Sequence, residues 1–208
     1  YFFNDKTEIE FLNIHFNNGF TFNTLRFIKN TIKFVCCKFS NNLSISDKTF
    51  ESRLLFNKCE FLSFHIQNIV FNHIFELYNC KISKSCVFFC TDFNDDIAFV
   101  NCNFMYNTFF TYTVFQKQVL FNGSKFKDKS SKPCGLDLSL SIIRGSLSFF
   151  QTYLENYKTQ KIEGNTQKYN DAIREGTLIP SQNKRETFRI IKNQLIEQNN
   201  LIEAEKYA

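Results

Sequence analysis

The sequence predicts an all-β solenoid, a parallel β-helix of short strands, followed by a C-terminal α-helical cap. A large apolar residue, usually Phe, returns every five or six residues between Phe34 and Phe126. The residue two positions before nearly every such anchor is apolar or small. Because residues i and i−2 of an extended chain point to the same face, each short segment has two inward residues that flank an outward one.

Between Phe34 and Phe126 the anchors alternate between gaps of five and six residues, with one five-for-six slip from Phe61 to Ile66. A gap of seven residues precedes Phe34, and one of 12 follows Phe126. Self-similarity at a short fixed period is typical of solenoids, whose single units are too small to bury a face alone. Steps of five and six keep no single face of an α-helix, and turn dipeptides typical of hairpins are scarce. The anchors are Phe11, Phe16, Phe22, Phe27, Phe34, Phe39, Ile45, Phe50, Phe56, Phe61, Ile66, Phe71, Leu77, Ile82, Phe88, Phe93, Phe99, Phe104, Phe110, Phe115, Phe121, Phe126, Leu138, Ile143, Phe149 and Leu154.

Small residues in the i−2 position define the length of a coil. They recur at intervals of 22, 21, 22 and 22 residues, as Cys37, Cys59, Cys80, Cys102 and Ser124. We therefore expect about four short segments per coil of about 22 residues, with these side chains in one interior column. Buried, reduced thiols are the ordinary form of free Cys, and they indicate a reducing cytosol.

One i−2 position carries a charge, Lys48. A lysine in an inward position requires either a deformed coil or a side chain that bends back to water. We expect a local register slip between Ser44 and Thr49 rather than a functional buried lysine.

Several triplets of the ladder resemble the central part of the pentapeptide-repeat unit, over about residues 9 to 154. The resemblance implies a right-handed quadrilateral β-helix. The six-residue gaps depart from the family pattern, in which a coil has four five-residue units, so we expect two corners to bulge or the square to flatten. An irregular larger β-helix and a leucine-rich repeat remain open alternatives. The matching triplets are Cys37-Lys38-Phe39, Cys59-Glu60-Phe61, Thr91-Asp92-Phe93 and Cys102-Asn103-Phe104.

The pattern changes after Leu154, which divides the chain into a β-helix (1–154) and a linker with a helical segment (155–208). A short helix is expected from Thr166, as N-cap, to Glu175, with Gly176 just past its end. Segment 185–204 is similar to a helical module that follows the repeats in some bacterial pentapeptide-repeat proteins. In those proteins the module can lead toward membrane-spanning segments.

A longer amphipathic helix is expected from Asn183 to about Gln198, with Asn183 and Glu186 as a capping box. Its apolar residues share one face at helical spacing. We expect this face to cover the last coil, since solenoids need a cap against edge-to-edge aggregation. The residues of the face are Phe188, Ile191, Leu195 and Ile202.

The sequence predicts no catalytic residue, no cofactor-binding residue and no metal ligand. The Cys lack C-x-x-C spacing, and His15, His65 and His73 are not spaced from a Cys as in zinc sites. Cys134, beside Lys132, is the best candidate for a reactive thiol, which needs exposure and a basic neighbour.

Adjacent and alternating carboxylates are interpreted as structural. Asp95 and Asp96 fit a corner, and Glu8 and Glu10 fit the outer surface of the first segment. Phosphate-binding and dinucleotide-binding glycine motifs are not found.

The formal net charge of +5 is mild. It disfavours an acidic, DNA-mimicking surface and does not by itself indicate nucleic-acid binding. A polar segment from Lys127 to Pro133 is expected to protrude as a basic loop. No run approaches the roughly 20 apolar residues of a membrane span, and no signal peptide is visible. The late basic residues are Lys125, Lys127, Lys129, Lys132, Lys184 and Arg185.

We therefore expect a non-enzymatic, cytoplasmic scaffold that mediates protein–protein interaction, with an unidentified protein partner or a second copy of the chain. Neither a small-molecule substrate nor a nucleic acid is expected. One alternative is the cytoplasmic domain of a bacterial membrane protein, tethered to the inner membrane by a segment beyond this chain. A topoisomerase-protecting role, as in some pentapeptide-repeat proteins, is disfavoured by the positive charge, and a pectate-lyase-like enzyme lacks a visible charged cluster.

Overall fold

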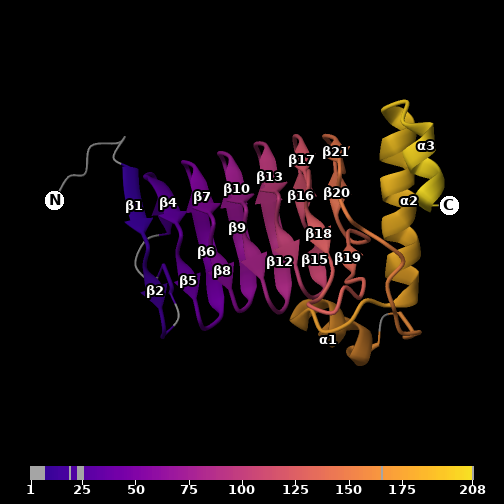
Figure 1. Ribbon diagram of the computed structural model, residues 1–208, viewed down its shortest axis with the longest axis horizontal. Coiled ribbons are helices and arrows are strands. Elements are labelled where there is room, and N and C mark those ends of the chain that lie inside the picture. The colour runs from indigo at the N-terminus through magenta and orange to yellow at the C-terminus, as the bar shows by residue number, and fades with distance from the viewer. Residues whose placement is uncertain (1–7, 19, 23–25, 165, 208) are drawn as a thin grey trace.

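The computed structural model describes residues 8–18, 20–22, 26–164 and 166–207. It shows a parallel β-solenoid, whose coils stack from the N-terminal end toward a short helical region at the C-terminal end (Figure 1). All pairings between the labelled strands are parallel, and they join each coil to the next. The predicted fold class is confirmed.

The described strands form three sheets along the solenoid, which we name A, B and C. Sheet A contains β1 (Glu8–Leu12), β4 (Thr31–Val35), β7 (Leu54–Asn57), β10 (Phe75–Tyr78), β13 (Ile97–Val100), β17 (Val119–Leu120) and β21 (Leu147–Ser148). Sheet B contains β2 (His15–Phe16), β5 (Lys38–Phe39), β8 (Glu60–Phe61), β11 (Lys81–Ile82), β14 (Asn103–Phe104) and β18 (Lys125–Phe126). Sheet C contains β3 (Phe27–Ile28), β6 (Leu43–Phe50), β9 (Phe64–Phe71), β12 (Cys86–Phe93), β15 (Thr108–Thr111), β16 (Val114–Phe115), β19 (Leu136–Asp137) and β20 (Ile142–Ile143).

The predicted coil length agrees with the strand register. Ile32 pairs with Leu54, Leu54 with Phe75 and Phe75 with Ile97, which are steps of 22, 21 and 22 residues. The 21-residue step contains the predicted slip between Phe61 and Ile66. Four segments per coil form only three sheets because the third and fourth segments join into one eight-residue strand in β6, β9 and β12.

Most of the five-residue gaps are turned by single residues in the left-handed conformation. In the first corner column these residues immediately precede the predicted cysteine column. In the second they lie inside β6, β9 and β12 and then, at Tyr112, between β15 and β16. A left-handed residue with a side chain costs about 1–2 kcal/mol, and Asn and Asp adopt this conformation more readily than most residues. The first column holds Cys36, Lys58, Asn79, Asn101 and Gly123, and the second holds Asp47, Asn68, Cys90 and Tyr112.

The interior consists of aromatic columns that continue from coil to coil. The rings of Phe34 and Phe56 stack with centroids 4.8 Å apart, and those of Phe99 and Phe121 with centroids 5.1 Å apart. Successive residues of a column thus repeat at the spacing of neighbouring strands. Rings of different columns meet edge to face, as Phe34 and Phe39 do. This arrangement is favourable because the positive edge of one ring faces the negative face of the other.

The cysteine column is confirmed. Cys37, Cys59, Cys80 and Cys102 are at most 1% exposed. The thiols donate to carbonyl oxygens of the preceding coil, for example Cys59 to Phe34 (Sγ–O 3.3 Å). Ser124 Oγ continues the series with a hydrogen bond to the carbonyl oxygen of Phe99 (2.6 Å).

The expected register slip between Ser44 and Thr49 is present toward the preceding coil, where Phe20 pairs with Leu43 and Phe27 with Thr49, steps of 23 and 22 residues. Toward the following coil it is absent. Ser44 pairs with His65, Lys48 with Ile69 and Thr49 with Val70 in one uninterrupted register. Lys48 is half-buried. A long side chain permits this because its methylene stem can cover apolar surface while the ammonium reaches water.

The first helix follows the prediction. Helix α1 (Gln167–Glu175) has Thr166 as N-cap, whose Oγ1 accepts a hydrogen bond from the Tyr169 amide (3.2 Å). It ends at Gly176, which has a φ of 65°.

The second helix differs from the prediction at its start and ends, as expected, near Gln198. Helix α2 (Ser181–Glu197) begins after Pro180, so the expected capping box of Asn183 and Glu186 is wrong. The Asn183 side chain is buried, and Glu186 pairs with Arg189 (2.6 Å).

The chain leaves the helical conformation after α2, where Asn199 has a φ of 58°. It then forms α3 (Leu201–Ala204) and the 3₁₀ turn η1 (Glu205–Tyr207). Ile202 is 80% exposed, so its expected place on the buried face with Ile191 is also wrong.

Helix α2 covers the last coil as a cap (Figure 1). The backbone of a helix cannot form ladder hydrogen bonds with the edge of a sheet. Here side chains of α2 accept hydrogen bonds from backbone amides of the last coil instead. Thr187 Oγ1 accepts from the Leu138 amide (2.9 Å), and Gln194 Oε1 accepts from the Leu147 amide (3.1 Å). The cap therefore satisfies backbone groups that would otherwise attract another strand.

Candidate interaction surface

The outer face of sheet B carries a column of charged side chains. Each two-residue strand of this sheet turns a Phe or Ile inward and the residue before it outward. The outward residues stand in register from coil to coil, in the order His15, Lys38, Glu60, Lys81, Asn103 and Lys125. All are exposed except Lys81, which is half-exposed.

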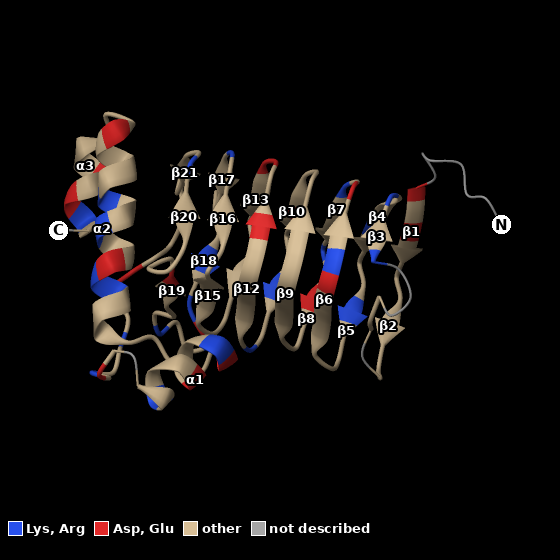
Figure 2. Ribbon diagram, turned by 180° about the vertical axis from the view of Figure 1, so that it is seen from behind, with Lys and Arg blue, Asp and Glu red and all other residues tan. Residues whose placement is uncertain are grey.

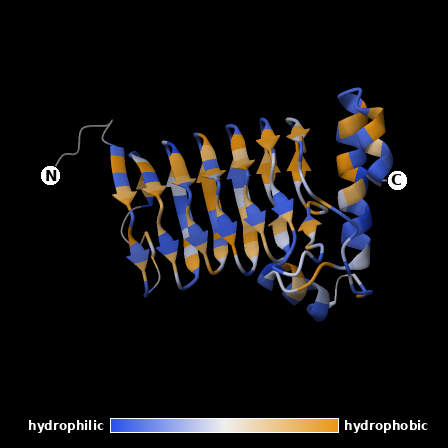
Figure 3. Cartoon of the chain, in the orientation of Figure 1, coloured by the Kyte–Doolittle hydropathy of each residue, from blue (hydrophilic) through white to orange (hydrophobic). Residues whose placement is uncertain are grey.

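Lysines occupy alternate coils of this column. Lys38, Lys81 and Lys125 are separated by Glu60 and Asn103, and we call these five side chains the basic face. None of the three lysines takes part in the ion pairs that the described residues form. Figure 2 shows basic residues at β5 and β18 and an acidic residue at β8. Figure 3 shows a row of hydrophilic segments along the length of the solenoid.

Two exposed lysines at neighbouring corners, Lys58 and Lys84, add to the positive charge beside this face. Lys127 extends it past Lys125, with its ammonium 5.0 Å from the ring centroid of Tyr153. This cation–π contact holds the end of the lysine stem over the aromatic ring.

Two cations on the outer side of sheet A are paired with carboxylates of the chain. Lys33 pairs with Glu8 (2.7 Å), and the guanidinium of Arg53 pairs with the buried carboxylate of Glu76. The Glu76 carboxylate also accepts from the Tyr78 hydroxyl (3.2 Å). The Glu76 hydrogen bond raises the pKa of Arg53 above its ordinary value.

Sheet C turns apolar in its later coils, where α1 covers it (Figure 1). At one outward position His65 is followed by Val87 and then by Phe109, and the last two are buried. Gly176, at the end of α1, packs closely against these two residues. A Cβ at this position would lie 2.4 Å from Val87 Cγ2 and would clash with it. His65 remains beside this contact, and burial lowers its pKa.

A buried carboxylate joins sheet C to both helices. Asp137 Oδ1 accepts from the Ser139 amide (3.0 Å) and hydroxyl (2.6 Å), and Oδ2 accepts from Asn183 Nδ2 (2.9 Å). The Asn183 amide oxygen in turn accepts from the Tyr169 hydroxyl (3.0 Å). Burial raises the pKa of Asp137, while these hydrogen bonds act in the opposite direction. The network orients α1 and α2 on the last coil.

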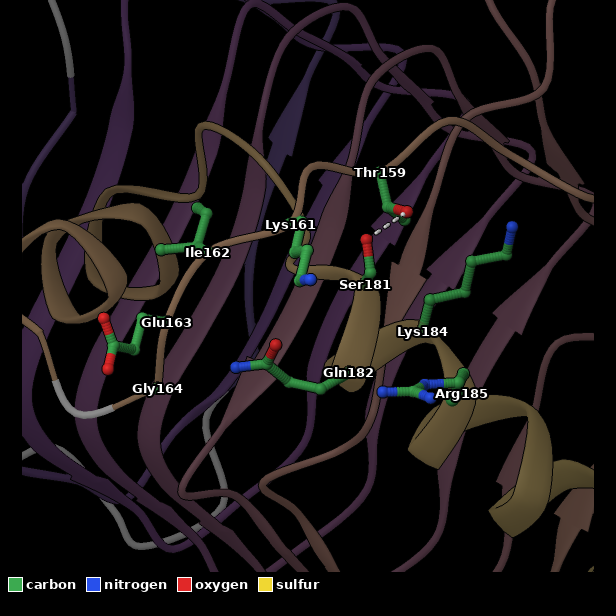
Figure 4. Close-up of a pocket in the computed structure, with 9 residues that line it drawn as sticks. All are labelled: Thr159, Lys161, Ile162, Glu163, Gly164, Ser181, Gln182, Lys184 and Arg185. Atoms are coloured by element: carbon green, nitrogen blue, oxygen red, sulfur yellow. Dashed lines mark hydrogen bonds between the residues drawn. The ribbon is translucent and has the colours of Figure 1, made fainter.

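A wide cavity of about 940 Å³ lies between segment 159–164 and the start of α2 (Figure 4). The Thr159 and Ser181 hydroxyls are hydrogen-bonded to each other (3.0 Å) across it. The Lys184 ammonium is held at the Tyr157 carbonyl oxygen (2.8 Å). The lining contains no His or Cys that could activate Ser181 as a nucleophile.

Cys134, the candidate for a reactive thiol, is buried. Burial raises its pKa to about 11, so its thiolate is scarce at neutral pH. Cys134 therefore lacks the exposure that a reactive thiol needs, because the segment after the loop folds inward.

Asp95 and Asp96 lie at a corner, as expected. Asp95 binds the ammonium of Lys117 (2.6 Å), which lowers its pKa, and Asp96 accepts from the Gln118 amide (3.1 Å). Both carboxylates therefore tie one coil to the next.

The three histidines make separate local contacts. His15 contacts the Ser40 hydroxyl (2.5 Å), His65 contacts the Ser85 hydroxyl (2.8 Å), and His73 Nδ1 accepts from the Ile74 amide (2.8 Å). Over the residues that the structure describes, no three His, Cys, Asp or Glu side chains gather as a metal site would require.

The late basic residues separate into two places. The loop from Lys127 to Pro133 closes through an antiparallel bridge, with Asp128 Oδ1 accepting from the Ser130 (2.7 Å) and Lys132 (2.9 Å) amides. Lys125 belongs to the basic face and Lys127 lies next to it, whereas Lys184 and Arg185 lie on α2.

The sequence pattern places Lys38 and Lys81 among the outward polar residues, but their alignment in one basic column was not predicted. The signal that could have found them is the 22-residue interval applied to the outward positions, which aligns Lys38, Glu60, Lys81, Asn103 and Lys125.

Comparison with family models, with curated proteins and with solved structures found no match. None of the helices in the described ranges is long and apolar enough to cross a bilayer.

Proposed function

We propose that this chain is a non-enzymatic scaffold that binds a protein partner through the basic face of sheet B. The observation that carries the proposal is the set of three lysines in alternate coils, of which Lys38 and Lys125 are exposed and Lys81 is half-exposed. None of them takes part in an ion pair among the residues that the structure describes. The pentapeptide-repeat resemblance remains a prediction, and the proposed function does not depend on it.

The solenoid suits this role because it holds the basic face rigidly. Strands β5, β8, β11 and β14 each bond to a strand on both sides, so the outward Cα positions are fixed before binding. A preorganised surface loses less conformational entropy when a partner binds. A polar, charged surface of this kind resembles the rim of a protein–protein contact, and unpaired charges accelerate encounter with a complementary partner.

Capture from cells that express the intact protein tests the proposal. Lys81→Glu reverses the central charge of the basic face, and Lys168→Glu makes the same charge change on an exposed position of α1. We expect a specific partner to be captured by the wild-type chain and Lys168→Glu, and to be strongly depleted with Lys81→Glu. Circular dichroism of both variants verifies the fold. Equal capture of that partner by the two variants would contradict the proposal.

A further inference from the structure

The spacing of the lysines along the solenoid limits the shape of what they can bind. On the strands of sheet B, the stacked rings of Phe39 and Phe61 are 5.0 Å apart, and those of Phe104 and Phe126 are 4.7 Å apart. One coil thus advances the solenoid by about 4.8 Å, the usual separation of neighbouring strands. Lys38, Lys81 and Lys125 occupy alternate coils and therefore repeat at about 10 Å.

An α-helix that lies along the solenoid axis matches this repeat. Seven residues of helix advance by about 10.5 Å and return to nearly the same face. An extended strand presents side chains to one face about every 6.8 Å, and this spacing loses register with the second lysine. Over the whole span from Lys38 to Lys125 the helix deviates by about 2 Å, which flexible lysine stems can absorb.

The charge between the lysines limits the chemistry of the ligand. Glu60 lies one coil from both Lys38 and Lys81. A uniform polyanion, such as duplex DNA with a charge about every 1.7 Å, would place negative charge against this carboxylate. A helix with acidic residues one heptad apart and a basic residue between the first two would match both signs. Its intervening basic residue, three or four positions along, would advance by about 5 Å, close to one coil.

Building on the proposed function, we propose that the partner segment is an acidic α-helix lying along the solenoid axis on the basic face. Its carboxylates stand at i, i+7 and i+14 and contact Lys38, Lys81 and Lys125. A basic residue at i+3 or i+4 contacts Glu60. The exposed Asn103 faces the second heptad and admits an uncharged residue there.

Two synthetic helical peptides of one composition test this pairing with the intact chain. The matched peptide carries Glu at i, i+7 and i+14 and Lys at i+4 on an Ala and Gln background. The control peptide carries Glu at i, i+5 and i+10, which spreads the carboxylates around the helix. Fluorescence anisotropy at low ionic strength gives both Kd values and that of a duplex DNA oligonucleotide.

We expect the matched peptide to bind about tenfold more tightly than the control, since exposed charge pairs each contribute roughly two- to fivefold. Its affinity should fall with added salt and with Lys81→Glu, while Lys168→Glu retains more of it. Equal affinities for the two peptides, or tighter binding of the DNA, would overturn the acidic-helix proposal.

The two proposals fail in different ways. Loss of the captured partner with Lys81→Glu, together with no discrimination between the peptides, refutes the acidic helix and leaves the protein-binding face in place. Unchanged capture with Lys81→Glu refutes the protein-binding face itself.

Discussion

The outer faces of sheets B and C are built from the same repeat but lie in opposite environments. On sheet C the outward position changes from His65 to Val87 and Phe109, and α1 buries the apolar pair. On sheet B the matching coils present Lys81 and Asn103 to solvent. The interior columns set the fold, and the outward residues decide whether a face is covered by the chain's own helix or is available to a partner.

The largest expected effect is on the covered face. Phe109→Ala should lower the free energy of unfolding by about 3–5 kcal/mol, because the ring is fully buried under α1 and its loss leaves a cavity. Asn103→Ala, on the exposed face of the same coil, should change it by less than about 0.5 kcal/mol. Urea unfolding followed by circular dichroism measures both values. Similar losses from the two substitutions would contradict the distinction between covered and exposed faces.

A smaller effect is expected at Asp137, which fixes the helices over sheet C. Asp137→Asn should cost about 1–3 kcal/mol, since the amide presents a donor where the carboxylate accepts hydrogen bonds. Unfolding of the variant and of wild type, at matched pH, measures this cost. An unchanged free energy of unfolding at neutral pH would show that the network does not hold the cap.

Asp137 should also make the free energy of unfolding depend on pH. Burial raises the Asp137 pKa in the folded state, so the folded chain binds the proton more tightly than the unfolded chain. The stabilising contribution is complete below the unfolded Asp pKa of about 3.9 and is lost as the pH rises through the folded pKa. The stability of wild type relative to Asp137→Asn should therefore fall from pH 4 upward. A difference that is constant with pH, or that rises, would contradict the direction assigned here.

The smallest effect on stability is expected on the basic face. Lys81→Glu should change the free energy of unfolding by less than about 0.5 kcal/mol, because the side chain is half-exposed and forms no ion pair with another described residue. Parallel urea curves for Lys81→Glu and Lys168→Glu check this. A loss of more than about 1 kcal/mol with Lys81→Glu alone would mean that this lysine supports the fold rather than a partner.

The interior could be predicted from sequence because inward residues alternate along each segment and repeat between coils. Cys37, Cys59, Cys80 and Cys102 needed only this arithmetic to be placed in one column. The outward column of sheet B obeys the same interval, so its alignment could also have been predicted. The exposure of this column depends on α1 packing on sheet C and not on sheet B, and no local sequence pattern specifies where α1 packs.

The errors arose where distant contacts outweigh a local pattern. Asn183 and Glu186 match a capping box, but Asn183 instead bonds to Asp137, 46 residues away, inside the helix. Cys134 follows a polar loop and yet folds inward. Lys48 keeps its register toward the following coil because residues before and after it pair there without a shift. Tertiary hydrogen bonding and burial decide such positions, and spacing along the chain does not reveal them.

Site-specific photo-crosslinking in cells tests the central claim most directly. A photoreactive residue at Asn103 lies within the basic face and leaves its lysines intact, and one at Gln67 lies exposed on the outer face of sheet C. We predict that a protein partner crosslinks from position 103 and not from position 67. A partner that crosslinks from position 67, or equally from both positions, would contradict the assignment of sheet B as the interaction surface.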